Sequence, residues 1–281
     1  MDHRAEIKEF LSSRRARLTP LQAGLPAYGG NRRVQGLRRE EVALLAGVSV
    51  DYYVRMERGN LAGASDSVLE ALARALQLDE AERDHLFTLA READAQPARR
   101  RSPAKRLRPE LQQVLDAITD VPAQIRNDRL DVLSANSLAR ALYADMFADP
   151  RPNIARFTFL HPAARDLFGD WSRAADDVAA ILRLQAAKNP HDKAFVELIG
   201  ELSTRSDDFR TRWASHNVRF HRSGRKRMHH PVVGDLELDF QAMDIPSDPG
   251  LVMVVYTAPA GSATADAFKL LASWEATQES V

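Results

Sequence analysis

The 281-residue chain contains no cysteine. This absence excludes disulfide frameworks, thiolate zinc sites and cysteine nucleophiles, and it fits a reducing compartment. No stretch approaches the roughly eighteen apolar residues that a membrane span needs. The first ten residues, MDHRAEIKEF, also lack the apolar centre of a signal peptide. We therefore expect a soluble cytoplasmic protein that does not enter a membrane.

Motifs of catalysis are equally absent. The sequence has no G-x-S-x-G, no Walker loop and no dinucleotide fingerprint. A metal site is disfavoured as well, because no H-E-x-x-H spacing occurs and adjacent strand residues point to opposite faces. The candidate metal ligands are the histidines of the C-terminal part, namely His216, His221, His229 and His230. We expect no enzyme, no catalytic residue, no metal and no cofactor.

Charge is balanced overall but unevenly placed. Up to Arg108 there are 20 Lys and Arg against 15 Asp and Glu, a net charge of +5, so the remainder of this neutral chain carries −5. A basic N-terminal part and an acidic C-terminal part indicate that only the N-terminal part binds a polyanion.

The front reads as five short helices. Apolar residues at helical spacing predict a helix from Arg4 to Arg17, and Thr19-Pro20 ends it. Further helices are expected over residues 38–46, over 50–58, from the N-cap Ser65 and from Asp79. Glu82 stands three residues after Asp79, as in a capping box. The basic, proline-interrupted stretch 94–108 reads as a linker, which either lies along phosphates or is a plain solvated tether.

The back reads as an α+β domain with one antiparallel sheet. Two short strands surround a turn at Asn127-Asp128, after a helix over 109–118. Helices are expected over SLARALYADMF and over 174–187, 193–202, 207–214 and 264–274. Strands are expected in HNVRFHRS and KRMHHPVV, on either side of a turn at Ser223-Gly224. GDLELDFQAMDI alternates cleanly, and the apolar run GLVMVVYTA is typical of a central strand.

The stretch EEVALLAGVSVDYYVRMERG carries the sharpest signal, a helix-turn-helix. Ala43 is small where two helices would cross, and Gly47 tolerates the positive φ of the turn. Ser49 caps the second helix, on which Tyr53 and Met56 face inward. The N-terminal part of that helix would enter the major groove of DNA.

The outward residues of this motif are the predicted DNA contacts. Tyr52 and Arg55 would reach base edges or nearby phosphates, and Asp51 would accept from cytosine or face a gap. The arginines at and before the first helix would approach phosphates. The predicted DNA-binding residues are Arg32, Arg33, Arg38, Arg39, Ser49, Val50, Asp51, Tyr52 and Arg55.

The string RRVQGLRREEVALLAGVSVDYYVRMERGN resembles the MmyB-like branch of the XRE-type bacterial regulators. The resemblance continues in LDVLSANSLARALY, HPAARDLFGDW and GELSTRSDDFRTRWASHNVRFHRSGRKRMHHPVVG. It implies a five-helix, lambda-repressor-like DNA-binding domain followed by a PAS-like domain that holds a small apolar, fatty-acid-like molecule. Gln35 and Ala64 stand where the family usually has proline, and neither touches the presumed DNA face.

A pocket among the aromatic residues of the PAS-like domain would hold the effector. An arginine at its mouth would suit an acidic head group. The predicted ligand-binding residues are Asn136, Phe159, Trp171, Arg205, Phe209, Trp213, His216 and Phe240. Asn136 could equally be a helix N-cap. Arg205 and Arg210 could equally be surface residues paired with Asp207 or Asp208.

The sequence thus predicts a helix-turn-helix domain over 1–93, a linker over 94–108 and a PAS-like domain over 109–281. We expect a transcription regulator that binds a pseudo-palindromic double-stranded DNA operator as a homodimer and senses a small apolar effector. The alternative is a regulator whose second domain is a protein-interaction or dimerisation module without a small ligand.

Overall fold

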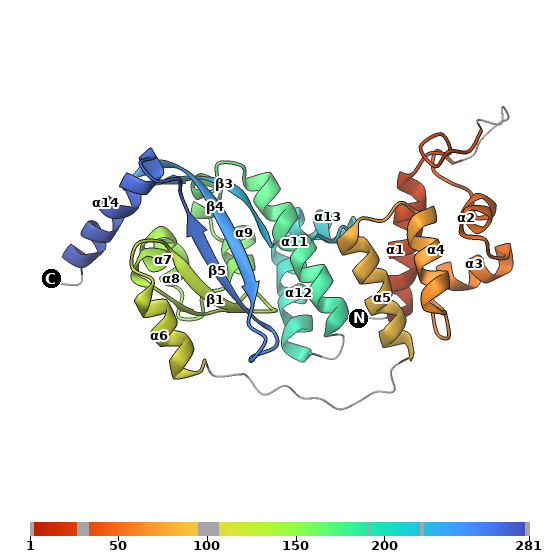
Figure 1. Cartoon of the computed structure of the whole chain (residues 1–281), viewed down its shortest axis with the longest axis horizontal. Helices are drawn as coiled ribbons and strands as arrows, with labels where there is room; N and C mark the ends of the chain where they lie inside the picture. Colours follow the sequence, from red (N-terminus) through yellow and green to blue (C-terminus); the bar gives the residue numbers. More distant parts are fainter. Residues whose placement is uncertain (1–2, 27–33, 95–106, 190–191, 220–221, 279–281) are drawn as a thin grey trace. The chain divides into compact units, whose positions relative to one another are not determined.

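The N-terminal region, as far as the structure describes it, is helical. The computed structural model describes residues 3–26, 34–94, 107–189, 192–219 and 222–278. In the described part of the N-terminal region the helices are α1 (His3–Arg17), α2 (Arg39–Ala46), α3 (Val50–Glu57), α4 (Asp66–Ala75) and α5 (Glu80–Asp94) (Figure 1). The five predicted helices are confirmed.

The predicted helix starts are also confirmed. The hydroxyl of Ser65 accepts a hydrogen bond from the Val68 amide at 3.4 Å. Asp79 and Glu82 each accept from the other's backbone amide, at 2.9 and 3.1 Å, and so satisfy two donors that the helix leaves unpaired.

Two compact units make up the chain. The first contains Met1–Arg101 together with Arg183–Val196 and Trp213–Arg219. Its apolar core is built by α1, α2, α3, α4 and α5, with Ala187 and Val218 packed into the same cluster. Burial of this shared apolar surface holds the short helices in place, since helices of eight residues are marginal alone.

A buried polar cluster accompanies that core. Glu6 on α1 forms an ion pair with Arg183, and His216 contacts Glu9 with Nε2 at 2.6 Å from the carboxylate. Burial would raise the pKa of Glu6, but His216 and Arg183 outweigh it and lower the pKa to about 2. His85 lies beside Glu6, fully buried, and burial lowers its pKa to about 3.

The second unit contains a five-stranded sheet (Figure 1). Its strands are β1 (Ala123–Asn127), β2 (Val132–Ala135), β3 (Ser223–His230), β4 (Gly234–Asp244) and β5 (Leu251–Thr257). Their order is β2-β1-β5-β4-β3, and all neighbouring pairs are antiparallel. The predicted α+β fold with one antiparallel sheet is confirmed, and GLVMVVYTA is its central strand.

Helices cover both faces of this sheet. The inner face, as we call it, packs against α7 (Ser137–Leu142), α8 (Ala144–Phe147), α9 (Ile154–Leu160), α10 (Ala163–Leu167) and α14 (Ala263–Gln278). The outer face packs against α6 (Pro109–Ala117) through Leu115 and Ile125. The remaining helices are α11 (Trp171–Lys188), α12 (Lys193–Arg205) and α13 (Asp207–Ala214).

Three local predictions were wrong. The helix expected over SLARALYADMF is interrupted at Tyr143, and α9 and α10 were not predicted. The turn expected at Ser223-Gly224 lies inside β3, where these residues pair with Gln241 and Phe240. The described residues of HNVRFHRS before Ser223 form no strand. Close packing favours glycine at 224, because a Cβ there would lie 3.1 Å from the Phe240 ring.

Candidate DNA interface and effector cavity

The helix-turn-helix has the geometry that its sequence predicts. Ala43 is buried, and Gly47 ends α2 with φ of 66°. The Val48 amide then donates to the Ala43 carbonyl at 3.0 Å, which closes the turn. Ser49 caps α3 by accepting from the Tyr52 amide at 3.1 Å.

The inward side of α3 fastens the motif to its neighbours. Tyr53 and Met56 are fully buried. The Glu57 carboxylate, only 2% exposed, accepts from Arg15 of α1 at 2.6 Å, from Arg39 of α2 and from the Tyr53 hydroxyl at 3.3 Å. Burial would raise the pKa of Glu57, but the bonds from Arg15 and Arg39 outweigh it and lower the pKa. We call these four residues the Glu57 cluster.

Among the described residues, no ion pair joins the outward side of α3 to another helix. Val50, Asp51 and Arg55 are exposed, and Tyr52 is half-buried. The Arg55 guanidinium lies 4.9 Å from the centroid of the Tyr52 ring, a cation–π contact that orients both side chains on one face. This face combines a guanidinium, a phenol, a carboxylate and an aliphatic side chain, which together can contact all the groups of a major groove.

The predicted phosphate contacts have different surroundings. Arg38 is exposed at the N-cap of α2 and lies 3.4 Å from Glu40. Arg39 is half-exposed, and its Nε bonds to Glu57. This bond joins α2 to α3 and does not depend on a phosphate contact. Arg32 and Arg33 lie outside the described residues.

In the second unit, the predicted ligand-binding residues divide into separate groups. Phe159, Trp171 and Phe209 come together, with Phe159 5.0 Å from Phe209 and 6.3 Å from Trp171 between ring centroids. Phe240 is buried in the inner face of β4. Arg205 is exposed and paired with Glu201 at 2.9 Å.

Trp213 and His216 belong to the first unit, where Arg183 stacks 3.9 Å from the Trp213 ring. Arg210 pairs with Asp207 on the surface, so its alternative role is confirmed. Asn136 caps α7 by accepting from the Ala139 amide at 2.9 Å, which also confirms its structural alternative. Its amide donates to the carbonyls of Ile118 and Val121, so no donor remains for a ligand.

A cavity of about 40 Å³ lies elsewhere in the second unit, between the inner face of the sheet and α11. Most of its lining is apolar, with Val254, Phe168 and Ile181 among the contributors. Its polar lining includes Gln124 and Arg126 of β1, Lys226 of β3 and the paired hydroxyls of Tyr143 and Tyr256, 3.0 Å apart. Burial, and then the neighbouring Tyr256, raises the pKa of Tyr143. None of the eight predicted ligand-binding residues lines this cavity.

Comparison with known families now decides the identity. The model of the MmyB-like transcription regulator ligand binding domain matches residues 107–271. A helix-turn-helix domain model matches residues 9–86. The chain belongs to the MmyB-like transcription regulator family. It is therefore a DNA-binding transcription regulator with a C-terminal ligand-binding domain. A comparison with curated proteins gives no match.

Gln124 and Arg126, which line the cavity of this MmyB-like regulator, were not predicted from the sequence. The signal was present in PAQIRNDRL, where glutamine and arginine alternate with alanine and isoleucine. Alternation of this kind is typical of a strand whose polar face is turned to solvent. Pairing of Gln124 with Val254 and of Arg126 with Val252 instead places the two polar residues on the inner face.

The described residues form neither a metal site nor a membrane-spanning helix. Within the part of the chain that the structure describes, no three His, Asp or Glu residues are grouped to hold a metal ion. His229 is exposed beside Asp235, His230 is buried and bonded to the Ala141 carbonyl, and His221 lies outside the described residues. In the same part of the chain, no helix has the length and hydropathy of a membrane span.

Proposed function

We propose that this MmyB-like regulator binds a specific double-stranded DNA operator through the outward face of α3 and changes its operator binding when an effector enters the ligand-binding domain. The observation that carries the proposal is the capped α2-turn-α3 motif, whose second helix exposes Arg55 and Asp51 and holds the half-buried Tyr52 beside Arg55. The N-terminal part of such a helix is the part that enters the major groove.

Each outward residue has a role in this proposal. Arg55 and Tyr52 contact base edges or adjacent phosphates, and Asp51 accepts from cytosine. Val50 packs on a thymine methyl, and Ser49 holds the first turn of α3 against the groove. Arg38 and Arg39, with Arg32 and Arg33 from the preceding loop, neutralise phosphates and fix the register.

The test uses the full chain and an operator selected from a random DNA pool. Arg55→Ala should weaken operator binding by about 1–3 kcal/mol, roughly 5- to 160-fold, and relax base preference at one position. The matched control is Arg74→Ala, the same change at an exposed residue of α4, which should leave affinity and preference intact. Equal binding of operator and competitor DNA by the unchanged protein would refute sequence-specific recognition.

The effector is proposed to be a small apolar, fatty-acid-like molecule in the cavity of the second unit. An apolar lining with a few placed polar groups is typical of ligand sites. We further propose that residues 1–93 bind DNA, that 94–108 join the two functions and that 109–281 bind the effector, in the cytoplasm where the DNA lies.

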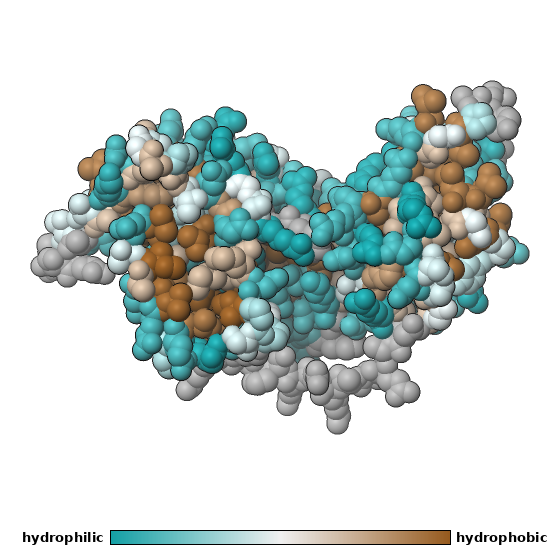
Figure 2. Space-filling model, viewed as in Figure 1, coloured by the Kyte–Doolittle hydropathy of each residue, from teal (hydrophilic) through white to brown (hydrophobic). Residues whose placement is uncertain are grey.

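Two copies are proposed to act on a pseudo-palindromic operator, because one helix-turn-helix covers only a half-site. A candidate contact surface is the apolar margin of the outer sheet face, which we call the outer patch. It contains Val114, Met243 and Met253, and Figure 2 shows apolar residues gathered over this part of the sheet beside α6. Val114 of α6 and Met243 of β4 are 47% and 42% exposed, which is high for large apolar side chains.

The alternative function is a regulator whose second domain only recruits a protein, and the outer patch is the observation in its favour. Light scattering of the unchanged protein and of Val114→Glu separates the two. A dimer that Val114→Glu converts to a monomer, with operator affinity reduced, supports self-association. A monomer in both cases, with the operator bound normally, favours recruitment of another protein.

A further inference from the structure

Helix α11 runs without interruption over the 18 residues Trp171–Lys188. Its part up to Leu182 belongs to the second unit, and its part from Arg183 onward belongs to the first. The division between the two compact units therefore falls inside a helix and not in a loop. Because each turn of an α-helix is hydrogen-bonded to the next, a displacement at one point of α11 moves the rest of the helix.

The second-unit part of α11 forms one wall of the cavity. Ala174, Val178 and Ile181 line it, and their spacing places them on one face of the helix. Asp177 lies beside them and is engaged with another group. Apolar side chains such as these three are held by burial, which has no preferred direction. The wall that α11 provides can therefore shift without the loss of a directed bond at these three positions.

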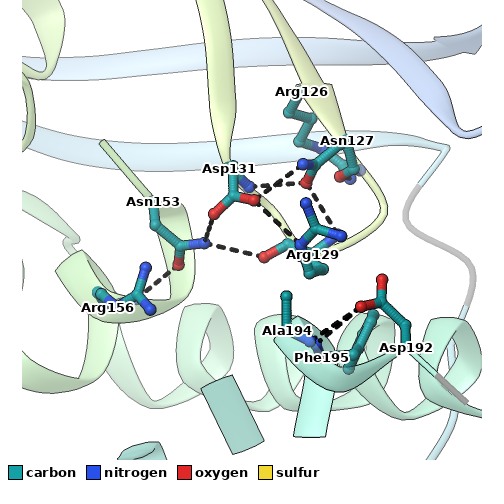
Figure 3. A network of polar contacts seen from close by, with 9 residues as sticks. All are labelled: Arg126, Asn127, Arg129, Asp131, Asn153, Arg156, Asp192, Ala194 and Phe195. Carbon is teal, nitrogen blue, oxygen red and sulfur yellow. Dashed lines mark hydrogen bonds and ion pairs between the residues drawn. The ribbon is translucent and has the colours of Figure 1, made fainter. Parts of the chain in front are cut away.

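The wall at the β1–β2 turn is held by hydrogen bonds instead. Leu130 and Ile154 line the cavity there. Their neighbours are joined by the Asp131 carboxylate, which accepts from Asn127 and from Asn153, each at 2.8 Å (Figure 3). In the sheet, β5 is paired on both sides, with β1 and with β4. A molecule that fills the cavity therefore displaces α11 more readily than it displaces the turn or the sheet.

The N-terminal end of α11 is fixed. The indole Nε1 of Trp171 donates to the Thr158 carbonyl at 2.9 Å, and the Arg165 guanidinium lies 3.7 Å from the centroid of the indole ring. At a rise of about 1.5 Å per residue, Val178 lies about 10 Å from Trp171 and Arg183 about 18 Å from it. A tilt about Trp171 that moves Val178 by about 1 Å thus moves Arg183 by about 1.7 Å.

Arg183 is held firmly in the first unit. The side chain is 2% exposed, and its two terminal nitrogens donate to the Glu6 carboxylate of α1 and to the Trp213 carbonyl. Its guanidinium also lies 3.9 Å from the centroid of the Trp213 ring. A hydrogen bond is lost when donor and acceptor separate beyond about 3.5 Å. A shift of about 1.7 Å at Arg183 therefore either breaks the ion pair with Glu6 or moves α1 with it.

Helix α1 connects Glu6 to the recognition helix. Arg15, on the same helix, bonds to Glu57 of α3 at 2.6 Å and to the Leu37 carbonyl at 2.9 Å. A change in the position of α1 therefore reaches α3 through the Glu57 cluster. The carboxylates at both contacts are buried, so neither ion pair is exchanged for water without a large cost.

We propose that α11 couples the cavity to the helix-turn-helix: a molecule in the cavity tilts α11 about Trp171, and the Glu6–Arg183 ion pair transmits the tilt to α1. This inference rests on the proposed function and names the path by which the effector changes operator binding. A buried ion pair suits this role because it has one favourable geometry and is costly to break. Glu6 and Arg183 are positioning residues, which act on the DNA contacts through α3.

The test is a double-mutant cycle, read as operator binding by the full chain. Val178→Phe fills part of the cavity from α11 and requires no identified effector. It should change operator affinity by at least about fivefold, the lower end of coupling between distant sites. Glu6→Gln keeps the volume and removes the ion pair with Arg183. In that background, Val178→Phe should change operator affinity by less than about twofold.

The matched control is Glu70→Gln on α4. It removes an ion pair with Arg83 of α5 inside the same unit, and no residue of α11 takes part in that pair. Val178→Phe should keep its full effect in this background. Thermal melting shows whether each variant is folded. Arg183→Gln replaces Glu6→Gln, and Ala174→Leu on the same cavity face replaces Val178→Phe, if either variant is unfolded at the assay temperature.

Two results would overturn the proposal. One is an equal effect of cavity filling with and without the Glu6–Arg183 ion pair. The other is an operator affinity that both Val178→Phe and Ala174→Leu leave unchanged. Hydrogen exchange gives a second readout, because Val178→Phe should alter the protection of α1 amides in the unchanged background and not in Glu6→Gln.

Tetradecanoate serves as a probe that separates this inference from the proposed function. Glu6→Gln should abolish any response of operator binding to tetradecanoate. If the unchanged protein and Glu6→Gln respond equally, the proposed function stands and the coupling through α11 fails. If the unchanged protein does not distinguish the operator from competitor DNA, the proposed function itself fails.

Discussion

The Glu57 cluster offers the sharpest test of how this regulator supports its recognition helix. One buried carboxylate receives Arg15 from α1, Arg39 from α2 and Tyr53 from α3, so three helices meet at a single negative charge. Glu57→Gln keeps the volume and removes the charge. Arg15 then faces a neutral amide in a site that is almost closed to water.

The magnitude follows from burial. Removing one partner of a buried ion pair costs about 3–5 kcal/mol. The amide oxygen of glutamine still accepts one bond, and Arg15 keeps its bond to the Leu37 carbonyl at 2.9 Å, so we expect a loss of about 2–3 kcal/mol. At about 1.4 kcal/mol per factor of ten, amides of α3 should exchange with solvent about 30- to 160-fold faster.

The assay is hydrogen exchange of the full chain, read on peptides that cover α3, together with operator binding. The matched control is Glu40→Gln on α2, whose carboxylate is 64% exposed and pairs with Arg38 at 3.4 Å. The exposed pair should contribute about 0–1 kcal/mol. If α3 exchanges equally fast in both variants, the Glu57 cluster does not stabilise the motif and the reasoning is refuted.

The same cluster has a defined pH dependence. Because the pKa of Glu57 is lower in the folded state than its ordinary 4.5, its contribution is fully present above pH 4.5. The contribution is lost as the pH falls through the folded value. The protection of the α3 amides, measured relative to unfolded amides at the same pH, should therefore fall in acid more in the unchanged protein than in Glu57→Gln.

Two further predictions concern the first unit. Gly59→Ala should destabilise it by more than about 2 kcal/mol, because the new Cβ would lie 2.4 Å from the Arg4 carbonyl oxygen. The control is Gly63→Ala, which has open space at its Cβ and a similar positive φ and should cost only about 1 kcal/mol. Equal urea midpoints for the two variants would contradict the contact with Arg4. Burial lowers the pKa of His85 to about 3, so the unfolded chain takes up a proton at higher pH than the folded one, and stability is retained above pH 6.5 and lost from there down to pH 3. By pH 5 the loss should reach about 2 kcal/mol, and a urea midpoint that stays constant from pH 7 to pH 5 would show that His85 does not titrate on unfolding.

The helix-turn-helix could be predicted because its determinants are local. Gly47 indicates a turn with positive φ, Ser49 indicates a helix N-cap, and Tyr53 and Met56 mark the buried face of the helix. All four lie within ten residues. Such signals do not depend on what packs against the motif. The register of α3 was therefore correct, and the outward face follows from it.

The second unit was less predictable where elements are short. Helices α9 and α10 have seven and five residues, too few for an apolar period to be recognised. Gly224 was interpreted as a turn residue because glycine commonly marks turns. In the structure it lies in β3 against the Phe240 ring of the neighbouring strand, a tertiary contact that the local sequence does not contain.

The candidate effector site shows the same limit at the level of function. Aromatic residues were predicted as ligand contacts because they dominate apolar pockets. Such residues also fill protein cores. The sequence alone does not indicate which aromatic side chain faces a cavity. Arg126 differs, because a buried arginine that forms no ion pair with any described residue is a costly arrangement. Recognising it required knowing which face of β1 is interior, and a strand of five residues takes that from its pairing with β5. Pairing with β5 is thus what places Arg126, an ordinary arginine in the sequence, in the wall of the cavity.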